Sequence, residues 1–167
     1  MTESSSSSGA RRGGHRRRAS ASAGKAGAGL DAIFTAAYPA ERGSVPRARR
    51  EVSAFAARHG AAGAKLEQIA LAVSEAATNV VVHAYERGAR ARTIVVDARL
   101  ERAGELCVTI ADGGAGLRTS HSSQGLGLGL SIVKRLTDGV ELSELPAGGL
   151  ELRMRFVLDG APAEPPV

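Results

Sequence analysis

The stretch from Ala64 to Glu86 narrows the choice of fold more than any other part of the sequence. Its apolar residues recur three and four positions apart, a spacing that predicts an amphipathic helix packed on a core. A second stripe, made of Glu75, Asn79 and His83, runs along the same helix, because residues four positions apart share a helix face. Taken alone, this polar stripe fits a solvated surface at least as well as the wall of an active site.

Strand patterns flank this helix on both sides. A first strand is predicted at Leu30–Ala40, followed by a helix that Ser44 would cap and Gly60 would close. After the long helix, "RTIVVDARLE" and "ELCVTIAD" alternate with period two and predict a hairpin, and a second strand pair, "VELSEL" and "LELRMRFVL", flanks "PAGG". This order predicts an α+β fold, a two-layer α/β sandwich in which helices cover one face of a mixed, mainly antiparallel sheet.

The chain divides into one predicted domain, residues 30–158, and two tails. Residues 1–29 are rich in Ser, Gly, Ala and Arg without apolar periodicity, which predicts a disordered basic tail, and residues 159–167 predict a frayed C-terminal tail. The formal net charge of +5 belongs to the N-terminal tail, since basic and acidic residues balance over the rest of the chain. Nucleic-acid binding is therefore expected only through that tail. No apolar run is long enough to span a bilayer, which predicts a cytoplasmic protein without a membrane partner.

Two glycine-rich segments follow the predicted hairpin. Asp112 precedes "GGAG", which fits an ordinary strand-ending turn, or a place where the backbone approaches a flat ligand while the carboxylate accepts from an amine. The run "GLGLGL", residues 125–130, lies in a predicted Gly/Ser loop that leads into a helix beginning near Ser131. Backbone N–H groups before a helix suit a phosphate, although a flexible hinge is equally compatible with this run.

The polar stripe, the aspartate-glycine turn and the glycine run occur in one order along the chain: Glu75-xxx-Asn79, Asp112-x-Gly114-x-Gly116 and Gly125-x-Gly127-x-Gly129. This order resembles the three boxes of the GHKL superfamily of ATP-binding domains, which includes gyrase, heat-shock chaperone, histidine kinase and mismatch-repair ATPases. Within it, "SEAATNVVVHAY" and "GLGLGLSIVKRLTDGVEL" resemble the anti-sigma factor serine kinases of Gram-positive bacteria. The resemblance covers roughly Leu30 to Leu158 and implies the histidine kinase-like ATPase fold.

The resemblance implies a role for each matching residue. Glu75 would be the catalytic base that activates an incoming hydroxyl, and Asn79 would be a ligand of Mg²⁺. Asp112 would accept a hydrogen bond from the adenine amino group of ATP. The other implied nucleotide-binding residues would shape the pocket or wrap the phosphates: Gly114, Gly116, Gly125, Leu126, Gly127, Leu128 and Gly129.

Four further positions complete the expected site. The segment Leu117–Gln124 would form a short ATP lid, and His83 would have a pocket-wall or packing role. Arg87 fits either a phosphate contact or an exposed helix end. Leu150 departs from the resemblance, because related domains commonly have a threonine here, and its absence weakens the expected hydrogen bonding around adenine.

The implied function is an ATP- and Mg²⁺-dependent protein-serine/threonine kinase that regulates transcription as an anti-sigma factor. It would hold a sigma factor through its first helix, with Arg47, Arg49 and Arg50 as candidate contacts, and phosphorylate a serine of an anti-anti-sigma (STAS) protein. A homodimer is also implied. Three alternatives stay open: a nucleotide-dependent regulatory binding module without kinase activity, the catalytic half of a histidine kinase, and DNA binding through the arginine-rich tail.

Overall fold

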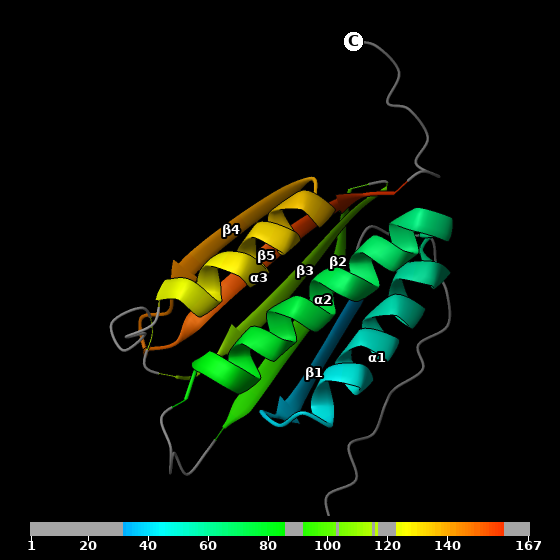
Figure 1. The fold of residues 1–167 in the computed structure, drawn as a ribbon. Helices are drawn as coiled ribbons and strands as arrows, with labels where there is room; N and C mark the ends of the chain where they lie inside the picture. The colour runs from blue at the N-terminus through cyan, green and yellow to red at the C-terminus, as the bar shows by residue number, and fades with distance from the viewer. Residues whose placement is uncertain (1–31, 86–91, 103, 115, 117–122, 159–167) are drawn as a thin grey trace, which may run out of the picture.

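The computed structural model describes residues 32–85, 92–102, 104–114, 116 and 123–158. Within them, a strand and two helices precede a hairpin, a third helix and two final strands, in the predicted order (Figure 1). The elements are β1 (Ile33–Pro39), α1 (Ser44–Arg58), α2 (Gly63–His83), β2 (Thr93–Arg102), β3 (Glu105–Asp112), α3 (Ser123–Leu136), β4 (Gly139–Glu144) and β5 (Leu150–Val157).

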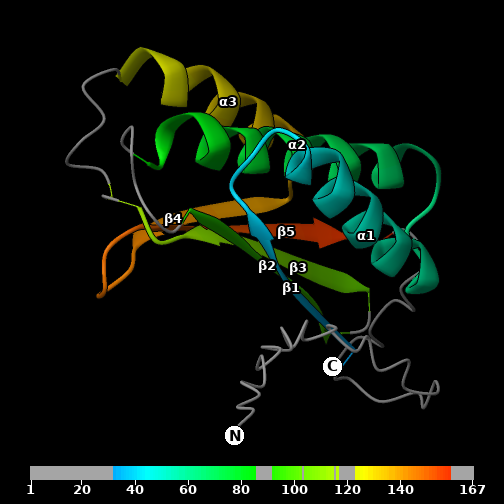
Figure 2. The ribbon, with the colours of Figure 1, turned by 90° about the horizontal axis from the view of Figure 1, so that it is seen from below.

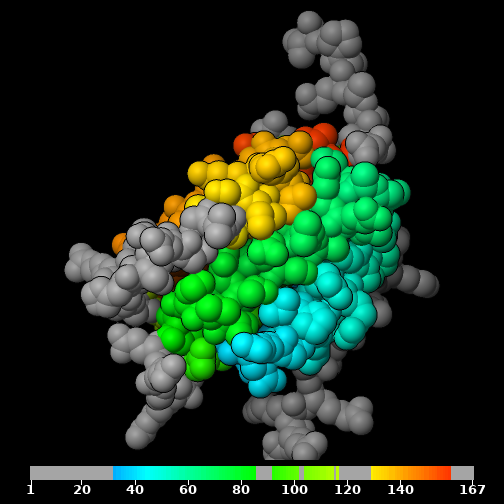
Figure 3. Space-filling model, viewed as in Figure 1, coloured from blue at the N-terminus to red at the C-terminus, as the bar shows by residue number. Residues whose placement is uncertain are grey.

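The strands form one sheet in the order β1-β2-β3-β5-β4, and each neighbouring pair is antiparallel. The helices all lie on one face of this sheet, and no helix of the described residues covers the other face (Figure 2). In the space-filling view, α2 lies between α1 and α3 (Figure 3). The predicted two-layer α/β sandwich is confirmed.

The hydrophobic core lies between the sheet and the helices. Alternate residues of the central strands face it, so that Ile94, Val96 and Val108 have no exposed surface. Helix α2 contributes Ile69 and Val73, which are also fully buried. Burying each such side chain contributes roughly 1.5–3 kcal/mol, and this fixes α2 firmly above the sheet. The helix can therefore serve as a rigid wall for a site.

The two ends of α1 differ in how well the sequence predicts them. Ser44 is not the N-cap but the first helical residue; Gly43 takes the cap position, without a side-chain hydrogen bond. The reason is a turn before the helix, in which the buried Ser44 donates its backbone N–H to the Glu41 carbonyl at 3.0 Å. The predicted closure at Gly60 is confirmed: its φ is +102°, and the next residue donates back to the Ala56 carbonyl at 3.0 Å.

Helix α3 begins at Ser123, well before the predicted start near Ser131. The run "GLGLGL" therefore lies inside the helix and not in a loop in front of it. A glycine inside a helix is unfavourable by about 1 kcal/mol relative to alanine, which is why the sequence predicts a later start. Packing against α2 opposes this preference, because Gly129 of the run lies so close to Asn79 that a Cβ there would be 2.8 Å from Asn79 Nδ2.

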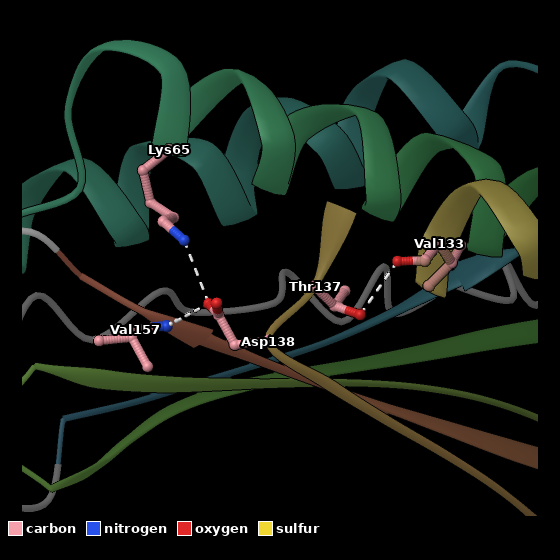
Figure 4. Close-up of polar contacts among 5 residues, drawn as sticks. All are labelled: Lys65, Val133, Thr137, Asp138 and Val157. Atoms are coloured by element: carbon pink, nitrogen blue, oxygen red, sulfur yellow. Dashed lines mark hydrogen bonds and ion pairs between the residues drawn. The ribbon is translucent and has the colours of Figure 1, made fainter. Parts of the chain in front are cut away.

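A polar brace ties the ends of α2, α3 and β5 together (Figure 4). Asp138, between α3 and β4, accepts a hydrogen bond from Lys65 Nζ at 3.1 Å and from the Val157 backbone N–H at 2.7 Å. Thr137 donates to the Val133 carbonyl at 3.0 Å and closes the last turn of α3. The brace fixes the end of the helical layer that lies at the start of α2.

Several predictions concern residues outside the described ones: the tails 1–29 and 159–167, residues 117–122 of the implied lid, and Arg87. No helix among the residues that the structure describes is long and apolar enough to cross a bilayer.

Candidate functional site

A cavity opens between α2 and the sheet, and Leu130 of α3 contributes to its lining. Helix α2 forms one wall, and the ends of β3, β4 and β5 form the floor. Most of the lining is apolar, and the carboxylate of Asp112 is the acidic group in it. The lining residues are Ala76, Asn79, Val80, His83, Ala84, Ile110, Asp112, Gly116, Leu130, Leu142, Leu150 and Leu152.

Asp112 ends β3 and is only 5% exposed. Its Oδ1 accepts from the Gly114 backbone N–H at 2.8 Å and from the Leu150 backbone N–H at 3.4 Å. Burial raises the pKa of the carboxyl above its usual value, and these two backbone hydrogen bonds oppose the rise without cancelling it. A buried carboxylate of this kind favours a ligand that donates a hydrogen bond to it.

Missing side chains allow the backbone to close around this carboxylate. A Cβ at Gly114 would lie 1.9 Å from the Ala84 carbonyl oxygen, so only glycine fits between the turn and the end of α2. A Cβ at Gly149, whose φ is +92°, would lie 2.0 Å from the Asp112 carbonyl oxygen. Gly149 is a site residue that the sequence prediction missed, although the "PAGG" turn was its signal.

The polar stripe of α2 divides at the cavity. Asn79 and His83 line it, as expected for a pocket wall. Glu75 lies one turn earlier on α2, partly exposed and outside the lining set. A group from another molecule could therefore approach Glu75 from solvent while a ligand occupies the cavity.

The glycine run meets this stripe through Gly129. A Cβ at Gly129 would lie 2.8 Å from Asn79 Nδ2 and 2.9 Å from Asn79 Oδ1, so the glycine lets α3 approach α2 closely. Gly125, Leu126, Gly127 and Leu128 lie in the preceding turns of α3. Gly129 lies midway along α3, so the Asn79 carboxamide lies beside the middle of this helix and not beside its start.

The remaining predicted glycine also reaches the cavity. Gly116 lines it with a φ of +71°, and a Cβ there would lie 3.1 Å from Glu144 Oε1. The structure thus brings residues of all three predicted segments to one place. The apolar side chains that complete the cavity were missed, because single leucines on separate elements carry no motif: Leu130 on α3, Leu142 on β4 and Leu152 on β5.

The described residues contain no group of three or more His, Cys, Asp or Glu side chains arranged to hold a metal ion. A Mg²⁺ ion bound here would take few protein ligands and would rely on ligand phosphates and water, as this cation commonly does. The Asn79 carboxamide oxygen is a suitable neutral ligand for it. The arrangement as a whole suits a flat, amino-bearing base in the apolar slot and an anionic group near Asn79.

Comparisons with known proteins bear on the family and the fold of the chain. Residues 38–156 match the family of the histidine kinase-like ATPase domain. The anti-sigma F factor of Pasteuria penetrans is 30% identical over 118 residues, which cover 64% of this chain and 78% of that protein. The crystal structure of the RsbU and RsbW domains of a Mycobacterium tuberculosis protein superposes with a TM-score of 0.59 at 20% identity. That match covers 76% of this chain but only 32% of the mycobacterial one, and it supports the fold alone.

Proposed function

The chain belongs to the histidine kinase-like ATPase family, and from this premise we propose that it binds ATP in the cavity beside α2. We propose further that it acts as an anti-sigma factor and as a protein-serine kinase. The family supports nucleotide binding, and the Pasteuria relative, named an anti-sigma F factor, supports the regulatory role.

The buried carboxylate of Asp112 at the end of an apolar slot carries the proposal. Adenine presents an exocyclic amino group, and a carboxylate is the natural acceptor for it. Both backbone hydrogen bonds to Asp112 end on Oδ1, so Oδ2 is the oxygen proposed to accept from adenine. The apolar side chains of Ile110 and Leu152, which are paired on neighbouring strands, would cover one face of the base.

The phosphates would extend from the slot toward Asn79 and the glycine run of α3. Mg²⁺ would be held by the Asn79 carboxamide oxygen together with phosphate oxygens, and it would supply charge neutralisation. Gly129 leaves room beside the Asn79 carboxamide, because a side chain at position 129 would collide with it. The glycines at 125 and 127 would let the first turns of α3 adapt to the phosphates.

Glu75 is the proposed catalytic base. In the proposed step, the hydroxyl oxygen of a partner's serine bonds to the γ-phosphorus while the bond from that phosphorus to the β,γ-bridging oxygen breaks. ADP leaves, phosphoserine forms, and the Glu75 carboxylate accepts the proton of the hydroxyl. The partial exposure of Glu75 outside the cavity lining suits a hydroxyl that arrives on another protein.

The proposed partners are a sigma factor and an anti-anti-sigma protein of the STAS class. Arg49 and Arg50 are exposed on α1 and are the proposed contacts for the sigma factor. Arg47 is a poorer candidate than the sequence suggested, because its Nε already binds Glu51 Oε1 at 2.8 Å. Homodimerisation remains part of the proposal through the resemblance alone.

The direct test is phosphoryl transfer to a candidate anti-anti-sigma protein from the same organism. Purified chain, ATP, Mg²⁺ and that protein should yield phosphoserine, detected by mass spectrometry. Glu75→Gln keeps the size of the side chain but cannot accept the proton, so transfer should fall by about 100-fold or more. Glu67→Gln, an exposed change earlier on the same helix, is the matched control and should leave transfer unchanged. Transfer that survives Glu75→Gln would remove Glu75 as the base.

The second candidate is a nucleotide-dependent binding module without kinase activity. The observation that favours it is the packing of the glycine run inside α3 against Asn79, which leaves less free backbone for a triphosphate. If ATP changes sigma-factor binding in a pull-down but phosphoserine never forms with any anti-anti-sigma protein, the module is the better description.

A further inference from the structure

The side-chain hydroxyl of Tyr85, just beyond the end of α2, binds the backbone of two strands. It donates to the Thr93 carbonyl at 2.7 Å, accepts from the Thr93 N–H at 3.0 Å and accepts from the Gly113 N–H at 3.0 Å. A phenolic oxygen has one proton to donate and two lone pairs to accept with. The three bonds therefore use the full hydrogen-bonding capacity of this hydroxyl.

The position of these bonds in the sheet explains their effect. The β2–β3 ladder runs in register up to the pair of Ile94 with Asp112. The next pair along the two strands would be Thr93 with Gly113. There the hydroxyl of Tyr85 lies between the strands and takes the place of a direct backbone bond. The two strands separate at this point, and the chain after Asp112 is free to turn toward α2.

This separation places the turn that holds the buried carboxylate. Gly114 follows Gly113 directly, and a Cβ there would collide with the Ala84 carbonyl, so the turn lies tightly against the end of α2. The Gly114 N–H is also one of the two donors to Asp112 Oδ1. Tyr85 thus fixes Gly113, and the next residue, Gly114, orients Asp112. Tyr85 and Ala84, which hold this turn, both lie just beyond the end of α2.

The ring of Tyr85 is held in place from outside. The Arg92 guanidinium lies over the ring, 5.5 Å from its centroid, and Arg92 Nη2 donates to the Val81 carbonyl at 3.2 Å. Tyr85 also packs against the core cluster. These contacts and the three hydrogen bonds hold the hydroxyl in position before any ligand arrives.

We propose that Tyr85 is a positioning residue of the nucleotide site, whose hydroxyl sets the Asp112–Gly114 turn for recognition of the base. This proposal rests on the proposed function, since it needs a nucleotide in the cavity. It concerns the base half of the ligand only. The phosphate half, near Asn79 and Gly129, has no contact with Tyr85 in the proposal and should not depend on it.

The test compares Tyr85→Phe with Tyr38→Phe by isothermal titration with ATP, adenosine and inorganic tripolyphosphate. Tyr38 is the only other tyrosine, and its hydroxyl donates to Glu51 Oε2 at 2.9 Å outside the cavity lining. Tyr85→Phe keeps the ring and its packing but leaves two backbone N–H groups without their acceptor. ATP and adenosine should each bind about tenfold more weakly, with tripolyphosphate unchanged. Tyr38→Phe should change none of the three affinities.

Each outcome decides between the proposals. If the wild-type chain binds ATP and Tyr85→Phe binds ATP and adenosine equally well, the positioning role is wrong while the proposed function stands. If Tyr85→Phe weakens tripolyphosphate as much as adenosine, the tyrosine supports the fold generally and the positioning role is again wrong. If the wild-type chain binds no ATP, the proposed function itself fails. Thermal unfolding of each variant fixes a titration temperature at which all chains are folded.

Discussion

Replacing Asp112 by asparagine should make the domain more stable and its nucleotide binding weaker. Asparagine has the same shape, and its Oδ1 can still accept from Gly114 and Leu150, at 2.8 and 3.4 Å in the wild type. The change removes a charge from a side chain that is only 5% exposed. Its amide NH₂ would, however, face the adenine amino group, so two donors would meet in the slot.

The magnitudes follow from the burial of the carboxylate and the bond it would make. A hydrogen bond to a charged group contributes about 1.5–3 kcal/mol, so ATP should bind roughly 10- to 100-fold more weakly to Asp112→Asn. Relief of the buried charge should raise the free energy of unfolding by on the order of 1 kcal/mol, within the usual range of a stabilising substitution. For a domain of this size, that is a rise in Tm of about 3–5 °C.

The sign of the pH dependence is fixed by the direction of the pKa shift. The folded chain holds the proton of Asp112 more tightly than the unfolded chain, because burial raises the pKa. The wild type therefore loses stability relative to Asp112→Asn as the pH rises through that raised pKa. The difference should vanish below about pH 4, where the carboxyl is protonated in both states.

The assay is thermal unfolding without nucleotide between pH 3 and pH 8, followed by titration with ATP at neutral pH. Asp97→Asn is the matched control, since Asp97 lies on β2 outside the cavity lining and bonds the Thr35 hydroxyl. It should not weaken ATP binding. The reasoning is refuted if Asp112→Asn is less stable than the wild type at pH 7, or if it binds ATP equally well.

Three further predictions concern other parts of the site and its frame. Gly129→Ala should lower the Tm, because its Cβ would lie 2.8 Å from Asn79 Nδ2. Overpacking costs about 1–3 kcal/mol, and the better helix propensity of alanine offsets about 1 kcal/mol of this. A raised Tm in thermal unfolding would contradict the close packing. Leu150→Thr should tighten ATP binding in titration by about fivefold, since a hydroxyl beside the buried carboxylate adds one hydrogen bond; weaker binding would count against it. Burial acts to raise the pKa of Asp138, but backbone and Lys65 hydrogen bonds lower it below its usual value. Asp138→Asn should therefore lower the free energy of unfolding by about 1 kcal/mol at pH 7. This loss should shrink as the pH falls below about 4, because the wild-type carboxylate is then protonated. A loss that does not change with pH would disprove the prediction.

Periodicity accounts for how well the frame of the domain was predicted. The apolar stripe of α2 and the alternation of β2 and β3 each specify one element and one buried face, so both follow from local sequence. The start of α3 does not, because helix propensity disfavours a run with Gly125, Gly127 and Gly129. Contacts with α2, distant in sequence, decide that helix, and no local pattern reports them.

The site shows the same division. Asp112 and Gly114 stand in a motif and could be predicted, although nothing in the sequence shows that the Ala84 carbonyl requires the glycine. Tyr85 could not be predicted, since one tyrosine after a helix is unremarkable until its hydroxyl is seen between two strands. Gly149 could not be predicted either, because its close approach to the Asp112 carbonyl joins two segments that are distant in sequence. Residues that act through close contact between distant segments become visible only in three dimensions.

Titration of the purified chain with ATP and with GTP, in the presence of Mg²⁺, tests the central claim most directly. A buried carboxylate accepts from the amino group of adenine but repels the carbonyl oxygen that guanine presents at the same position. The account predicts one ATP bound per chain, with GTP at least about tenfold weaker. No measurable ATP binding, or equal affinity for ATP and GTP, would contradict the assignment of the cavity as an adenine-nucleotide site.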